Sequence, residues 1–83
     1  MSAQKTFENL VNLIAQKARI DPKSAELQAI GLLLQDAEYL EADQVDQSGD
    51  YLIIGEGIND SRKTPAKAFS EKSIFDLIVT LQS

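Results

Sequence analysis

Hydrophobic residues recur with a helical period near the start of the chain. The spacing i, i+3, i+4, i+7, i+11 predicts a helix over residues 6–19, with Thr6 as its N-cap. Asp21-Pro22 then marks a restart, because aspartate caps well and proline fits the first helical position. A second helix is expected over residues 22–41. The apolar face of the first helix comprises Phe7, Leu10, Val11, Ile14 and Ala18.

The second predicted helix is apolar on two sides. Such a helix is either central in its domain or part of an interface. Gly31 falls outside both stripes and lowers the stability of the helix. The broader stripe contains Leu27, Ile30, Leu33, Leu34, Ala37 and Leu40, and the opposite stripe contains Ala25, Ala29, Leu32 and Tyr39.

The middle of the chain changes to strand composition, and the end returns to a helical pattern. Residues 51–54, Y-L-I-I, predict a strand, and residues 64–69 are either a returning strand or an ordered loop. Pro65 would place that returning strand at an edge, because proline cannot donate to a ladder. Residues 70–82 predict a helix that Ser70 caps, with a hydrophobic staple between Phe69 and Ile74.

These elements predict one small α+β domain over residues 1–83. It contains two N-terminal helices, a short β-hairpin or strand-plus-loop, and a C-terminal helix. A small all-α bundle with one irregular segment is the alternative.

The motif Gly55-Glu56-Gly57 follows the predicted strand and invites comparison with a nucleotide-binding loop. A dinucleotide loop requires a third glycine and a helix directly afterwards, and here Glu56 and Asp60 would repel phosphate. The two glycines are therefore expected to end a strand, form a bulge or supply positive φ in a turn.

The chain of 83 residues contains no cysteine and no histidine. Disulfides, thiolate metal sites and histidine-dependent catalytic triads are therefore excluded. The acids near Gly49 do not fit the register of a calcium-binding EF-hand loop. We expect no enzyme activity, no catalytic residues, no cofactor and no metal.

No apolar run approaches the length of a membrane span, and residues 1–9 lack a signal-peptide core. A cytoplasmic protein without membrane association is expected. The small size and the absence of cysteine and histidine suggest a bacterium, phage or mobile element as the source.

Charge is distributed unevenly along the chain, whose net charge is −5. Residues 36–60 contain eight acids and no lysine or arginine, and Arg62, Lys63 and Lys67 follow directly. One interpretation is a solvated surface. Another is an acidic surface that docks a basic protein, including one that itself binds nucleic acid. Nucleic acid is disfavoured as a direct ligand, because phosphates require a positive surface.

The sharper interpretation is a non-catalytic protein-binding module, acting as an adaptor, regulator or inhibitor. Tyr39 and Tyr51 are the expected anchors, although partial burial in the core is an alternative role. The competing hypothesis is a structural homo-oligomer, such as a dimer pairing the acidic segment with residues 62–67. The candidate contact residues are Asp36, Tyr39, Glu41, Asp43, Asp46, Asp50 and Tyr51.

The segment S-G-D-Y-L-I, residues 48–53, is similar to a motif in small acidic immunity proteins directed against nuclease bacteriocins. The chain also resembles that family in its size, charge and helical start, which implies an inhibitor. Residues 53–55 stand where that family places two tyrosines and a proline, so the family's binding residues are not carried over.

Overall fold

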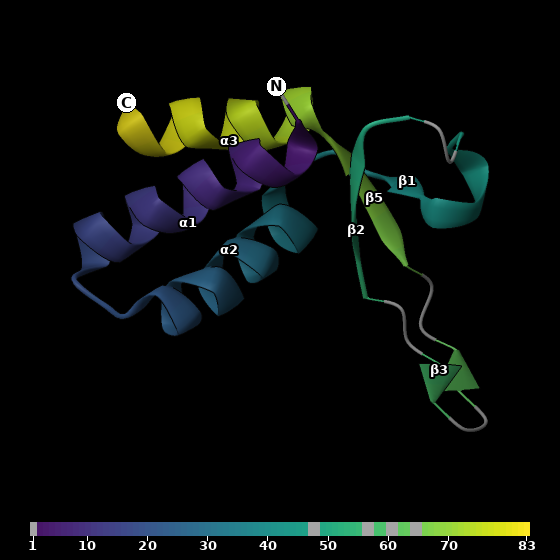
Figure 1. Ribbon diagram of the computed structural model, residues 1–83, viewed down its shortest axis with the longest axis horizontal. Helices are drawn as coiled ribbons and strands as arrows, with labels where there is room; N and C mark the ends of the chain where they lie inside the picture. Colours follow the sequence, from purple (N-terminus) through teal and green to yellow (C-terminus); the bar gives the residue numbers. More distant parts are fainter. Residues whose placement is uncertain (1, 47–48, 56–57, 60–61, 64–65) are drawn as a thin grey trace.

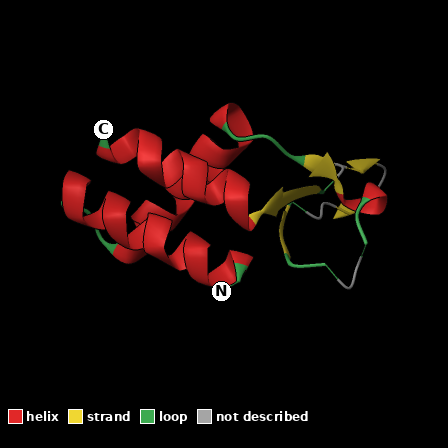
Figure 2. Ribbon diagram, turned by 90° about the horizontal axis from the view of Figure 1, so that it is seen from above, coloured by secondary structure: helices red, strands yellow, loops and turns green. Residues whose placement is uncertain are grey.

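The computed structural model describes residues 2–46, 49–55, 58–59, 62–63 and 66–83, with the backbone alone for 58–59 and 62–63. Helices α1, α2 and α3 lie side by side at one end, and a small sheet lies at the other (Figures 1 and 2). The α+β prediction, with two N-terminal helices and a C-terminal helix, is confirmed.

Helix α1 spans Ala3–Ala18 and lies between the other two helices. Ser2 caps it by accepting a hydrogen bond from the amide of Lys5 at 3.0 Å. The prediction that Thr6 caps this helix is wrong, because Thr6 is buried one turn inside it and donates to Glu71 of α3. The buried face of α1 consists of Ala3, Thr6, Phe7, Leu10 and Ile14.

Helix α2 spans Pro22–Asp36, so it ends five residues before the predicted boundary. Ala37 is extended, with φ −93° and ψ 153°. Two features oppose a longer helix: its last turn has no basic residue, and Asp36 and Glu38 lie at its negative end. The extended chain also brings Tyr39 against Phe69.

The buried face of α2 is formed mainly by the narrower of the two apolar stripes that the sequence predicts, the one that contains Ala25 and Ala29. Ala25, Ala29 and Leu33 are fully buried, whereas Leu27 is 73% exposed. The small alanines allow α1 and α2 to approach closely. Leu27 and Leu34 therefore face outward, contrary to the simplest interpretation of the broad stripe.

The main sheet is antiparallel, with strand order β1-β5-β2. Strand β2 spans Tyr51–Ile54 as predicted, and β5 spans Lys67–Ser70. Strand β1, Leu40–Glu41, was not predicted, and neither was the following 3-10 turn Ala42–Gln44. Gly55, with φ +85°, directly follows β2, which confirms the expected role for that glycine.

The prediction of an edge position for the returning strand is wrong, because β5 is central. It begins at Lys67, so it contains no proline and all of its amides are available to the ladders. Pro65 itself lies outside the described residues. A separate pair, β3 (Ile58–Asn59) and β4 (Arg62–Lys63), forms a two-stranded antiparallel ladder.

Helix α3 spans Glu71–Gln82 and begins as predicted. Ser70 accepts a hydrogen bond from the amide of Ser73 at 3.2 Å, and Phe69 and Ile74 are both fully buried. Ile74, Leu77 and Ile78 complete the core with α1 and α2. Strand β5 therefore continues directly into a helix that packs on the other two.

Candidate partner-binding site

The two predicted aromatic anchors line one surface hollow, although twelve positions separate them in the sequence. Its volume of about 520 Å³ falls within the range typical of ligand pockets. Tyr39 lies just before β1, and Tyr51 begins β2. Because β1 and β2 flank β5, the sheet brings both tyrosines to one site. The hollow is lined by Glu38, Tyr39, Leu40, Tyr51, Ala68, Ser70 and Ser73.

Tyr39 is held on one side and exposed on the other. Its ring meets Phe69 edge-on, with centroids 5.8 Å apart and an interplanar angle of 62°. The Nζ atom of Lys67 lies 5.1 Å from the centre of the same ring. The side chain nevertheless remains 43% exposed. An aromatic group fixed in this way loses little conformational entropy when a partner covers its free side.

Tyr51 is positioned by the turn that precedes it. The amide of Gly49 donates to the carbonyl of Asp46 at 2.8 Å. A Cβ atom at Gly49 would lie 2.7 Å from Cε2 of Tyr51, which is closer than real side chains approach. The absence of a side chain at Gly49 therefore allows the tyrosine ring to lie against this turn.

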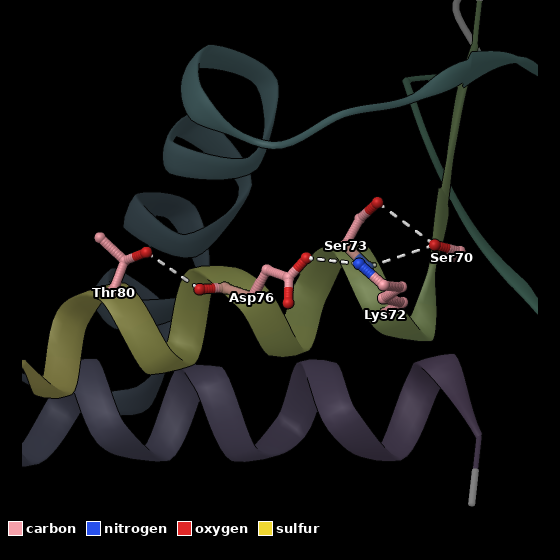
Figure 3. Close-up of polar contacts among 5 residues, drawn as sticks. All are labelled: Ser70, Lys72, Ser73, Asp76 and Thr80. Atoms are coloured by element: carbon pink, nitrogen blue, oxygen red, sulfur yellow. Dashed lines mark hydrogen bonds and ion pairs between the residues drawn. The ribbon is translucent and has the colours of Figure 1, made fainter.

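The far wall of the hollow comes from the start of α3. The hydroxyl of Ser70 accepts from the Ser73 amide and donates to the Ser73 hydroxyl, both at 3.2 Å (Figure 3). These bonds fix the first turn of the helix. Further along α3, Lys72 pairs with Asp76 at 3.1 Å, and Thr80 donates to the Asp76 carbonyl at 3.0 Å.

A second hollow of about 290 Å³ extends this site along α3. It shares Glu38 and Ser73 with the first hollow, so the two hollows adjoin at these residues. The remaining lining residues are Asp36, Ala37, Asp76, Leu77 and Thr80. We call the two hollows together the tyrosine groove.

Two carboxylates of the tyrosine groove are available for a ligand. Asp36 and Glu38 are exposed, and neither side chain has a hydrogen bond or ion pair with any other described residue. Asp76 also lines the groove, but it pairs with Lys72 on the surface. The acids therefore lie beside tyrosine and leucine side chains, which suits a ligand with an apolar stem and a positive end.

Other acids of the predicted set have internal roles. Glu41 pairs with Lys67, directly opposite on β5, at 3.2 Å. Both carboxylate oxygens of Asp50 lie 3.1 Å from the amide of Ala3, the first residue of α1. This contact satisfies a free amide at the positive end of that helix. Both residues thus support the fold within this chain.

The remaining acids lie elsewhere. Asp43 is exposed on the 3-10 turn and does not line the tyrosine groove. Asp46 lines a different hollow of about 320 Å³, which adjoins the first at Tyr51. The side chains of Glu56 and Asp60 lie outside the described residues, as do those of Arg62 and Lys63. The self-association hypothesis involving residues 62–67 therefore stays a prediction.

Nine of the residues that line the tyrosine groove were absent from the predicted site. Glu38 belongs to the acidic run of residues 36–60, which predicts a binding surface. Ser70 is predicted only as a helix cap. Leu40 was assigned to a helical stripe. Nothing in the sequence associates Ser73 with Tyr39, because the packing of α3 beside the sheet creates that proximity.

Comparison of the chain with protein-family models, curated proteins and solved structures found no match. Among the described residues, no helix is long and apolar enough to cross a membrane. Within the same part of the chain, no three acidic side chains gather in a way that could hold a metal ion.

Proposed function

We propose that this chain is a non-catalytic protein-binding module whose tyrosine groove docks a basic segment of another protein. The observation that carries this proposal is the shared hollow, in which Tyr39 and Tyr51 lie beside the unpaired carboxylate of Glu38. Adaptor, regulator and inhibitor roles all fit this mode of binding. A nucleic-acid-binding protein is a suitable partner, because its own binding surface is basic.

Arginine is the side chain that best fits the groove. Its guanidinium stacks on aromatic rings and forms bidentate hydrogen bonds with carboxylates. Lys67 already contacts the Tyr39 ring, so an arginine would stack on the part of the ring that remains exposed. Asp36 and Glu38 would receive the positive charge, while Leu40 and Tyr51 would contact the aliphatic stem.

The proposal is tested by NMR titration of the ¹⁵N-labelled chain with a short arginine-rich peptide. A peptide with glutamate in place of every arginine is the control. We expect amide shifts concentrated at residues 36–40, at Tyr51 and at residues 68–77, and none with the control peptide. Shifts of equal size at exposed acids outside the groove, such as Glu26, would contradict it, and so would an absence of shifts.

A further inference from the structure

Helix α2 presents an outward apolar stripe that none of the described elements covers. Leu27 is 73% exposed and Leu34 is 43% exposed, with Ile30 half-buried between them. Gly31, which falls outside the two stripes predicted from the sequence, lies next to Leu27 on this exposed side of the helix, and a Cβ atom there would meet nothing within 4 Å. None of these residues lines the tyrosine groove. We call residues 27, 30, 31 and 34 the α2 stripe.

The α2 stripe is self-complementary in the antiparallel sense. Leu27 and Leu34 lie at equal distances from the midpoint between Ile30 and Gly31. Reversing a second copy of the helix about that midpoint places Leu27 opposite Leu34 of the other copy. It also places Ile30 opposite Gly31, so a large side chain meets a position without one. A two-fold interface requires this kind of match of a surface with itself.

The charges at the two ends of α2 favour the same orientation. Lys23 lies one turn before Leu27 on the same side, and it has no ion pair with the rest of the described chain. The opposite end of the helix carries Asp36 and is followed by Glu38. An antiparallel pair opposes the two helix dipoles, and it brings Lys23 of one copy to the end of the other helix that carries these acids. A parallel pair would instead bring like ends together.

We infer that two copies of this chain associate through the α2 stripe as an antiparallel, two-fold symmetric dimer. The apolar contacts of this interface lie outside the tyrosine groove, and the inference does not depend on the proposed function. The dimer would present two grooves, so a partner with two basic segments would gain from binding both.

Sedimentation equilibrium over a range of protein concentrations tests the dimer. We expect the wild type to reach twice the monomer mass and Leu27→Glu to remain a monomer. Val79→Glu is the matched control, because it adds the same charge at a 48% exposed position on α3. Circular dichroism checks that both variants fold. A wild type that stays monomeric overturns the inference, and so does an equal response of the two variants.

Single-cysteine variants test the orientation, since the chain has no cysteine of its own. An antiparallel pair predicts that Ile30→Cys cross-links with itself under mild oxidation. It also predicts that Leu27→Cys cross-links with Leu34→Cys when the two proteins are mixed, and only weakly with itself. Efficient self-linking of Leu27→Cys would indicate a parallel pair and overturn the assignment.

Discussion

At the residue scale, Gly49 has the most direct effect on the shape of the tyrosine groove. Its lack of a side chain lets Tyr51 lie against the turn that ends at Gly49, and that turn places the ring at the groove. Gly49 is thus a positioning residue for Tyr51. Its effect on binding would be indirect, through the orientation of the ring.

Gly49→Ala is expected to lower the free energy of unfolding by roughly 1–3 kcal/mol, the usual range for overpacking. The added methyl group would meet Cε2 of Tyr51 at 2.7 Å and the carbonyl oxygen of Asp46 at 3.0 Å. Urea denaturation measures the loss of stability, and tyrosine fluorescence reports the displaced ring. The control is Gly31→Ala at monomeric concentrations, which should stabilise the helix by up to ~1 kcal/mol. Equal effects at both glycines would contradict this account.

At the element scale, the starts of α2 and α3 were predicted from the sequence, whereas the end of α2 was not. Ser70 and Asp21 are short-range signals, because each cap bonds an amide three residues ahead. Ser2 caps α1 in the same way, because it accepts a hydrogen bond from the amide of Lys5, three residues ahead. The end of α2 depends on contacts that Tyr39 and Leu40 make with β5, far along the chain, and no local pattern reports these.

Asp21 also makes the stability of α2 dependent on pH. Hydrogen bonds from the Ser24 amide and then the Ser24 hydroxyl hold the pKa of Asp21 below its ordinary value of 3.8. A lowered pKa in the folded state means that the stabilisation is complete above that ordinary value. It is lost as the pH falls from about 3.8 through the folded-state pKa.

Asp21→Asn provides the comparison, because asparagine also caps helices but does not titrate in this range. The difference in thermal stability between wild type and variant should be constant near neutral pH. It should change only below the ordinary pKa of aspartate. A difference that stays constant into strong acid, or that changes near neutral pH, would refute the assignment.

At the scale of the whole molecule, Asp50 joins the sheet to the helices. It precedes β2 and accepts the first amide of α1, across a sequence separation of 47 residues. The acidic run predicts a binding surface, but Asp50 and Glu41 have partners inside the chain. Sequence alone did not separate the two groups, because acids with and without internal partners look the same in a charge count.

Asp50→Ala is therefore expected to destabilise the fold by about 1–2 kcal/mol, through the loss of a charged acceptor at a helix start. Asp43→Ala is the matched control and should change stability by less than ~0.5 kcal/mol. Urea denaturation of the two variants gives the comparison. If both lose the same stability, the Asp50 contact does not support the fold.

The tyrosine groove itself was partly predictable. Tyr39, Tyr51 and Asp36 belonged to the predicted site, because exposed aromatics and acids are typical of interfaces. The groove also requires the wall from α3, which forms only when the C-terminal helix packs next to the sheet. The central claim is that a partner binds at the tyrosine groove. The alternative is that the negative charge of the whole surface attracts a basic partner without a localised site.

The most direct test of that claim is a comparison of two charge reversals with the same effect on net charge. Isothermal titration calorimetry measures the affinity of Glu38→Lys and Asp43→Lys for the arginine-rich peptide. We predict that Glu38→Lys weakens binding at least about tenfold more than Asp43→Lys does, a difference of ~1.4 kcal/mol. An equal loss in both variants would contradict the groove as the binding site.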